Sequence, residues 1–438
     1  MHRRDFITRT VSALAAVPVL SAASSMLTQG ASARPLLELS DWSSVRGQFE
    51  LRRDRIHMAS FLMSSHPRPV AAAIERHRRK LDADPVGYWT ENFQTAEPRV
   101  QAAAADYLDT EPGWIALTGS TTMGLGLIYS TIQVRADQEI LTTTHDHYST
   151  IKSLELRAER TGASVREIAL YDHGSEATVD EILTRMREAI NERTRVFAVT
   201  WVHSSTGVKL PIAEMSAELA NINSDRDPEE RVLFCVDGVH GLGVDAVTFD
   251  ELGCDFFIAG THKWLFGPRG TGIICGRPEA WEAVDPIIPS FGPSSMVWVG
   301  MLPPDTDRIT HGSYHTPGGF HSFEFRWALD EAFHFHQAIG KDRIEQRIHT
   351  LNTRAKQALA EMTHVQLHTP MSEELSGGMV CFEVDGHSPG AVTEHLAANG
   401  IIASPSPYPV SYARIAPSLI NNEEEVDRAV AAIAGMAN

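Results

Sequence analysis

The sequence predicts an α/β protein with a large, doubly wound, mostly parallel sheet and a smaller C-terminal α+β domain. Short apolar runs at 196–202, 232–236 and 256–259 each end in polar or small residues, as buried parallel strands do. A polar, turn-rich stretch at 221–230 separates a helical segment from the second run, so strands and helices alternate. The length of 438 residues leaves room for both domains.

Net charge and cysteine content limit the partners. The formal net charge is −18 at pH 7, which argues against nucleic acid or an anionic membrane as a partner, because both would repel the chain. The four cysteines, at 235, 254, 275 and 381, do not follow the spacing of a disulfide scaffold. Three of them lie in apolar, strand-like runs, so we expect free buried thiols.

The N-terminus has the pattern of an export signal. Arg3 and Arg4 precede a weakly apolar run at 11–19, and small residues at 31–33 offer a cleavage site. We interpret residues 1–33 as a twin-arginine signal, which predicts export of the folded protein by the twin-arginine machinery to the periplasm, with no membrane contact after cleavage. The apolar run is too short to span a bilayer. The alternative is an ordinary basic N-terminal helix.

Two neighbouring strand ends present an anion and an amine to one crevice. Asp237 ends the run at 232–236, and Lys263 follows the run at 256–259. The chain has only six lysines against 32 arginines, and this one stands among apolar residues, so burial would make it a nucleophilic amine. Pyridoxal phosphate (PLP) needs both groups, a lysine for its aldehyde and a carboxylate for its ring nitrogen. A structural Asp–Lys ion pair is the alternative.

The segments VDGVHGLG and AGTHKWLFGPRGTG resemble the cofactor-binding core of the class V aminotransferase family, which has fold type I and includes cysteine desulfurases, kynureninases and isopenicillin N epimerase-like enzymes. The resemblance implies that Lys263 forms the imine with PLP and that Asp237 pairs with the pyridine nitrogen. It also implies that His240 contacts the phenolic oxygen and that His262 lies beside the phosphate. The expected fold is therefore that of a fold type I PLP-dependent transferase.

A phosphate site is predicted where an apolar strand from Trp114 runs into a small-residue turn. Gly119, Ser120 and Thr121 stand at the start of the next helix, where free backbone amides and hydroxyls bind phosphate. They match the phosphate cup of the family. The alternative is a plain hydroxyl N-cap.

Two further cofactor contacts come from the resemblance. His147 follows the strand at 139–144 and occupies the place of the family histidine that stacks on the pyridine ring. Ser204, after the strand at 196–202, stands where relatives often carry an asparagine that bonds the ring oxygen. A histidine pair at 145 and 147 is a possible metal site in spacing, but no third ligand follows at helical spacing, and we predict no metal.

Arg414 and Trp89 are the substrate candidates. The segment YARIAP around Arg414 resembles the family's carboxylate-binding arginine, which implies a bidentate hold on the substrate α-carboxylate. A surface arginine is the alternative. Trp89 is a candidate wall of the substrate pocket or, equally, a core residue.

Residues 283–320 are rich in Pro, Gly and Ser and are expected to form active-site loops. Within them Thr316 resembles the family residue that reaches the phosphate of the neighbouring subunit, which implies a homodimer. We place the N-terminal segment and large PLP domain at 34–330, and a linker helix and small domain at 331–438. A long helix is expected from residue 323 to 340, followed by a second that ends near Met362.

The resemblance implies chemistry at the α-carbon of an amino acid or an amino-acid-derived substrate, with aminotransfer as the main expectation. Epimerisation or C–S/C–N cleavage is the alternative, including the tailoring of siderophore precursors in the periplasm. Desulfuration is disfavoured because no cysteine stands in a mobile-loop position. From another class, a metal-dependent hydrolase would use the 20 histidines but would leave Lys263 without a role.

Overall fold

The computed structural model describes residues 39–292, 294–303 and 309–437. The export signal expected at 1–33 lies outside these residues. Within the described part, no helix is both long enough and apolar enough to cross a membrane.

A seven-stranded mixed sheet is the centre of the large domain. Its order is β2-β8-β7-β6-β5-β3-β4, and β8 is antiparallel to both neighbours while the remaining pairs are parallel. The strands are β2 (Ile115–Thr118), β3 (Glu139–Thr143), β4 (Ser164–Ile168), β5 (Thr194–Thr200), β6 (Leu233–Asp237), β7 (Phe256–Gly260) and β8 (Gly272–Gly276). The predicted doubly wound, mostly parallel sheet is confirmed, and the strands ending at Asp237 and before Lys263 are adjacent.

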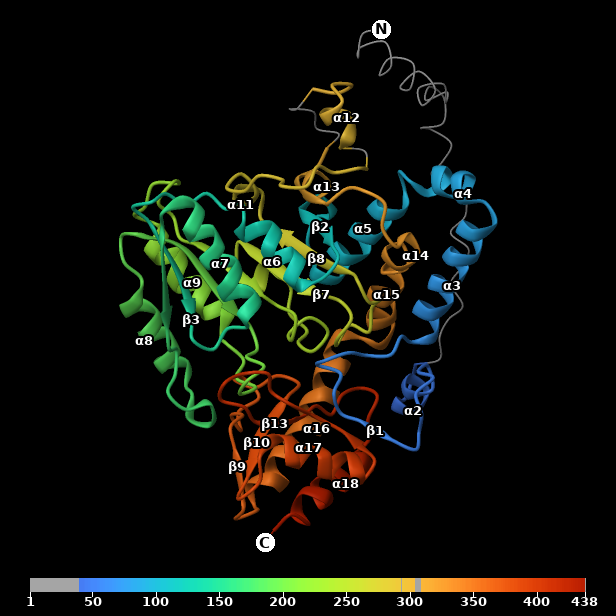
Figure 1. Cartoon of the computed structure of the whole chain (residues 1–438), viewed down its shortest axis with the longest axis vertical. Helices are drawn as coiled ribbons and strands as arrows, with labels where there is room; N and C mark the ends of the chain where they lie inside the picture. The colour runs from blue at the N-terminus through green and yellow to red at the C-terminus, as the bar shows by residue number, and fades with distance from the viewer. Residues whose placement is uncertain (1–38, 293, 304–308, 438) are drawn as a thin grey trace. The chain divides into compact units, whose positions relative to one another are not determined.

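Both faces of this sheet are covered, because alternate side chains of each strand enter different cores. In β6, Phe234 and Val236 enter one cluster, and Leu233 and Cys235 enter the other. Helices α6 (Thr121–Tyr129) and α7 (Tyr148–Thr161) pack in the second cluster, and α5 (Ala96–Leu108), α8 (Val179–Ala189) and α9 (Ile212–Asn223) pack in the first. Figure 1 shows these helices around the strands.

The remaining elements before the linker are short or lie in the N-terminal segment. They are α2 (Trp42–Arg46), α3 (Arg68–Ala83), α4 (Pro85–Asn92), η2 (Pro112–Trp114), η3 (Gly174–Glu176), α10 (Phe249–Leu252), α11 (Pro278–Trp281), α12 (Ser295–Trp298) and α13 (His311–His315). The described residues of the stretch expected to be loop at 283–320 therefore include two single-turn helices among irregular backbone.

The single helix expected from residue 323 to 340 was wrong, because the structure breaks it into α14 (Phe323–Arg326) and α15 (Asp330–Ile339). Arg99 of α5 donates to the carbonyl of Trp327 at 3.2 Å and to the carboxylate of Asp330 at 2.8 Å. The cross-helix contact replaces a helical hydrogen bond at the break. Gly340, at φ 98°, then separates α15 from α16 (Lys341–Ala360).

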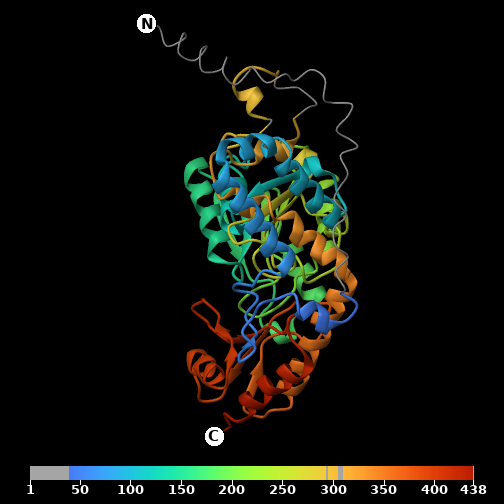
Figure 2. The same ribbon diagram turned by 90° about the vertical axis from the view of Figure 1, so that its right-hand side faces the viewer.

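The C-terminal residues form a lobe of their own, drawn in orange and red in Figures 1 and 2. Its antiparallel sheet has the order β12-β13-β10-β9, from β9 (Val365–Leu367), β10 (Val380–Val384), β12 (Ser404–Pro405) and β13 (Ala413–Ile415). Helices α17 (Pro389–Ala398) and α18 (Glu423–Ala434) complete it. The N-terminal segment contributes β1 (Ile56–His57), which pairs in parallel with β11 (Ile401–Ile402). The domain boundary that we propose at 330/331 falls at the start of α15.

Candidate active site

A cavity of about 270 Å³ lies at the carboxyl ends of β5, β6 and β7, the edge where open α/β sheets bind ligands. It brings together nine of the twelve site residues predicted from the sequence. Its lining is Phe61, Leu62, Ser120, Thr121, Thr122, Leu125, His147, Ser149, Thr200, Ser204, Asp237, Val239, His240, His262, Lys263, Pro407 and Arg414.

The loop after β7 positions Lys263. The Ser64 hydroxyl donates to the carbonyls of His262 and Lys263, and the Ser64 amide also donates to the His262 carbonyl, at 3.1 Å. Phe266, three residues on, has φ 56°, a left-handed conformation that costs energy in a bulky residue. Burial lowers the pKa of Lys263, against the opposing charge of Asp237. The loop therefore holds a partly buried amine with an increased neutral fraction.

His240 stands between Lys263 and an indole. Its Nε2 lies 3.2 Å from Lys263 Nζ, and its Nδ1 accepts a hydrogen bond from Trp264 Nε1 at 3.3 Å. Burial, and after it the charge of Lys263, holds the pKa of His240 well below its ordinary value, so the ring is neutral.

Asp237 ends β6 as a buried carboxylate that accepts a hydrogen bond from the amide of Val239 at 3.1 Å. It forms no ion pair with any side chain in the described part of the chain. Burial raises its pKa above the ordinary range, and the Val239 amide and the charge of Lys263 oppose that rise. Such a carboxylate favours a cationic nitrogen as its partner.

The N-terminus of α6 brings Ser120 and Thr121, two of the three residues predicted for the phosphate cup, to the cavity. The Ser120 hydroxyl caps the helix by accepting from the amide of Met123 at 3.1 Å, and Thr121 Oγ1 accepts from the amide of Gly260 at 2.8 Å. A Cβ at Gly260 would lie 2.8 Å from Thr121 Oγ1, so only glycine lets β7 approach this closely. His262 lines the same end, and burial lowers its pKa to about 4. A neutral ring there can donate one hydrogen bond to an anion.

His147 and Ser204 line the cavity from neighbouring strand ends. His147 is the N-cap of α7, where its Nδ1 accepts from the amide of Ser149 at 3.3 Å, and this bond leaves the proton of the neutral ring on Nε2. The hydroxyl of Ser204 lies 2.5 Å from that of Tyr408, so it is already hydrogen-bonded to a side chain of the C-terminal lobe.

Arg414 is buried, with 4% of its surface exposed, and has no carboxylate partner within the described residues. It donates to the carbonyls of Ser204 and Pro405, each at 2.9 Å, and its guanidinium lies 4.3 Å from the centre of the Phe61 ring. Carbonyl dipoles do not neutralise a full positive charge. The cavity therefore presents an uncompensated cation, which is what a substrate carboxylate requires.

Three predicted residues do not line the cavity. The Gly119 amide turns toward Met123 Sδ at 3.4 Å. Thr316 is buried, where its hydroxyl accepts from the Leu117 amide at 3.0 Å and donates to Gly312 at 2.8 Å, so its contact with a second subunit stays a prediction. Trp89 lies in an aromatic group with Phe93, Phe291, Phe320 and Phe323.

Tyr408 was not predicted. It lies in the loop after β12 and, with Ser204, separates the first cavity from a second one of about 610 Å³. The second cavity is lined by two stacked pairs, His145 on Tyr171 and His368 on Tyr412. The only sequence signal for Tyr408 was a large aromatic residue within a Pro- and Ser-rich turn, which is too common to identify a site.

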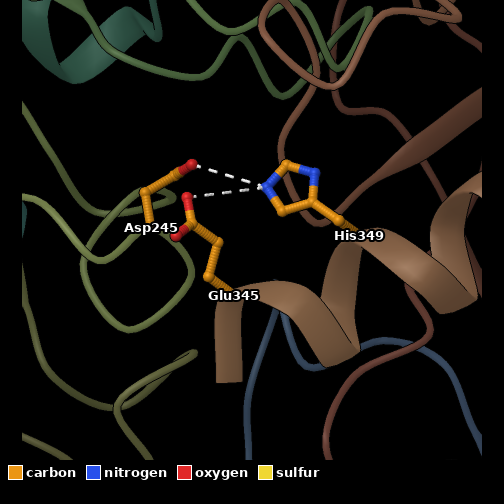
Figure 3. Close-up of side chains that lie close together, drawn as sticks. All are labelled: Asp245, Glu345 and His349. Carbon is orange, nitrogen blue, oxygen red and sulfur yellow. Dashed lines mark ion pairs between the residues drawn. The ribbon is translucent and has the colours of Figure 1, made fainter. Parts of the chain in front are cut away.

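A second group of titratable side chains joins α16 to the loop after β6 (Figure 3). Asp245, Glu345 and His349 offer ligand atoms that lie within 4.8 Å of one another. Lys209 Nζ, however, lies 2.6 Å from Asp245 and already supplies the positive charge. Burial raises the pKa of Asp245, but His349 and Lys209 outweigh it, and the net pKa is lowered. The group acts as an ion-pair network that holds α16 against this loop.

The cavity fits PLP. Lys263 would hold the aldehyde, and the start of α6 offers amides and hydroxyls to the phosphate. The buried Asp237 carboxylate has no ion-pair partner among the described residues, and a protonated ring nitrogen would provide one. The fold and this site define a fold type I PLP-dependent enzyme.

Comparison with known proteins agrees with this assignment. The Aminotransferase class-V family matches residues 66–406, and the chain belongs to this family. Isopenicillin N epimerase of Streptomyces clavuligerus is 27% identical over 405 residues, which cover 90% of this chain and 97% of that protein. A cysteine desulfurase of Cronobacter sakazakii is 26% identical over 382 residues, which cover 83% of this chain and 86% of that protein.

Solved structures show the same fold. A C-DES mutant with glycine covalently linked to the PLP cofactor has a TM-score of 0.77 and 20% identity, with 89% of this chain and 98% of that chain covered. The cysteine desulfurase CsdA of Escherichia coli has a TM-score of 0.73 and 19% identity, with 90% and 97% covered.

The expected fold, cofactor and enzyme class are thereby confirmed. The named relatives are an epimerase and desulfurases rather than aminotransferases, so they favour our alternative reaction over our main expectation. The metal-dependent hydrolase has no support from them.

Proposed function

We propose that this protein is a PLP-dependent epimerase acting at the α-carbon of an amino acid or an amino-acid-derived substrate. The observation that carries the proposal is the position of Arg414 in the same cavity as the Lys263 amine, as a buried guanidinium with no carboxylate partner among the described residues. One group binds an α-carboxylate, and the other meets the neighbouring α-amine and α-proton.

The roles of the residues follow from this geometry. Arg414 orients the substrate through its carboxylate. Lys263 Nζ, once free, removes the α-proton from one face of the α-carbon. Asp237 keeps a proton on the ring nitrogen of the cofactor. When bound, PLP supplies a conjugated ring that accepts the negative charge left at the α-carbon.

Two observations favour epimerisation, the first over aminotransfer and the second over desulfuration. Isopenicillin N epimerase matches over nearly its whole length. All four cysteines are free and buried, and burial raises the pKa of each thiol, so none can serve as the exposed nucleophile of a desulfurase. Inversion also needs a proton source on the opposite face of the α-carbon. His147, with its proton on Nε2, and the Tyr408 hydroxyl are the candidates.

Proton exchange in D₂O tests the proposal. Purified holoenzyme is incubated with single enantiomers of amino acids and short peptides, and Cα deuteration and enantiomer composition are followed by NMR and chiral chromatography. Deuterium gain with inversion supports epimerisation. Ammonia release would refute epimerisation and indicate a lyase. Turnover that depends on an added keto acid would refute it and indicate an aminotransferase.

We also propose that residues 1–33 are a twin-arginine signal and that the mature enzyme works in the periplasm. The support is Arg3 and Arg4, the short apolar run and the small residues at 31–33. A fusion of residues 1–40 to a fluorescent protein should reach the periplasm only in cells with the twin-arginine machinery. An Arg3→Lys, Arg4→Lys fusion exported equally well would contradict the assignment.

A homodimer is proposed in addition, with Thr316 near the phosphate of the second subunit. Exposed apolar side chains support it, since Phe320 is 76% exposed, Val299 64% and Met301 53%. Analytical ultracentrifugation should give twice the chain mass, and Phe320→Glu should shift the protein toward monomer. A monomeric parent protein would refute the dimer.

A further inference from the structure

The three side chains Lys263, His240 and Trp264 form a chain of hydrogen bonds whose direction is fixed at one end. An indole Nε1–H can only donate, so His240 Nδ1, which lies 3.3 Å from it, must be the acceptor. A neutral imidazole carries one proton, which then resides on Nε2. That nitrogen faces Lys263 Nζ at 3.2 Å.

We propose that Trp264 is a positioning residue that locks His240 in the Nε2–H tautomer, so that His240 donates to the lone pair of Lys263 and holds the lysine as a free amine. An ammonium group has no lone pair, and a protonated Lys263 would place two donors against each other. This role of Trp264 rests on the proposed function, in which Lys263 anchors the cofactor and must be a free amine to capture it.

The surroundings hold the indole firmly enough for this role. Trp264 is 1% exposed. A Cβ at Gly378 of the C-terminal lobe would lie 2.6 Å from Trp264 Cη2, and a Cβ at Gly243 would lie 2.7 Å from the Trp264 backbone carbon. Two glycines thus leave the space that the ring and its backbone occupy.

The other charged and titratable groups facing this chain of bonds leave the argument intact. Asp237 favours a protonated Lys263, and Arg414 disfavours it. His147 and His262 face His240, and burial lowers the pKa of each. Asp237 is thus the group that opposes the neutral amine, and the indole acts against it through His240.

The test measures capture of the aldehyde by protein stripped of cofactor, so it does not depend on turnover. Pyridoxal phosphate is mixed with apo protein across a pH series, and the rise of visible absorbance is followed by stopped flow. In Trp264→Phe, which keeps an aromatic ring but loses the N–H, capture at pH 7 should be about fivefold slower, the equivalent of about 1 kcal/mol for one hydrogen bond. The midpoint of its pH profile should move to higher pH.

Trp281→Phe is the matched control. Trp281 is also 1% exposed and donates from Nε1 at the same distance of 3.3 Å, but to the carbonyl of Trp114. Its capture rate and pH midpoint should equal those of the parent protein. Equal profiles for the two variants would overturn the proposal.

A second measurement works even if Trp264→Phe fails to fold. In ¹⁵N-histidine-labelled apo protein, the His240 signals, assigned by their loss in His240→Gln, should show a protonated Nε2 and an unprotonated Nδ1. A proton on Nδ1 would refute the inference. If the parent protein captures no pyridoxal phosphate, the proposed function fails as a whole, whereas capture with the wrong tautomer removes the role of Trp264 alone.

Discussion

Replacing Arg414 with glutamine should strongly reduce kcat/KM while leaving the stability of the fold nearly unchanged. The guanidinium has carbonyl partners and no carboxylate in the described structure, so its charge is free for a substrate. Two charge-assisted hydrogen bonds to an α-carboxylate contribute about 3 kcal/mol, which is about 150-fold in kcat/KM. Stability should change by less than about 1 kcal/mol, because the variant loses hydrogen bonds but also removes a buried charge that the fold does not neutralise.

The assay compares kcat/KM and urea unfolding for Arg414→Gln and for Arg157→Gln. Arg157 of α7 is a matched control, since its guanidinium likewise donates to backbone carbonyls, in its case the three of Ser130, Thr131 and Ile132. The control should keep the kcat/KM of the parent enzyme. An unchanged kcat/KM in Arg414→Gln, or an equal loss in both variants, would refute the reasoning.

Three further predictions concern single side chains. Lys263→Ala should lose the cofactor mass that borohydride fixes in the parent protein, as read by intact mass spectrometry, and kcat should fall by about 10³-fold; a fixed cofactor in the variant would contradict the anchor. Tyr408→Ala should join the two cavities and raise the kcat/KM of phenylalanine relative to alanine by about tenfold, while Tyr408→Phe, which keeps the ring, should not. His336 is fully buried, and burial lowers its pKa to about 3. The unfolded chain, with an ordinary pKa of 6.5, then binds the proton more readily, so stability falls as the pH drops from about 6.5 toward 3, by about 2 kcal/mol at pH 5. His336→Phe should reduce the loss of urea-unfolding free energy between pH 7 and pH 5 by that amount, and an equal loss in both proteins would show that this ring does not titrate on unfolding.

The broken helix at 327–329 shows where sequence patterns fail. The helical pattern continues through Trp327, and no proline or glycine interrupts it. The break follows from Arg99, which lies 228 positions away from Trp327 in the sequence and donates a hydrogen bond to the Trp327 carbonyl. The helix propensity of neighbouring residues carries no information about a contact between residues so far apart in the sequence.

Much of the cofactor site was predictable because its residues stand at strand ends. An apolar run indicates a buried strand, and the first polar residues after it lie at the carboxyl edge of the sheet. Asp237, His147, Ser204 and Lys263 all follow such runs and all line the cavity. Thr316 and Trp89 stand in irregular segments without this periodicity, and the structure does not bring them to the cavity of this chain.

By itself, then, the sequence determined the alternating fold, because burial imposes a period that can be seen locally. It indicated the cofactor through the Asp237 and Lys263 pair and through the family resemblance of the motifs around them. Only the tertiary structure decided that Arg414 has no carboxylate partner in the part of the chain that it describes, that Tyr408 meets Ser204 across 204 positions, and that the Trp264 indole faces His240. These facts depend on how the C-terminal lobe docks on the sheet and on which atoms compete for each charge. Such contacts leave no periodic trace in the chain, since they are set by packing between segments far apart in sequence.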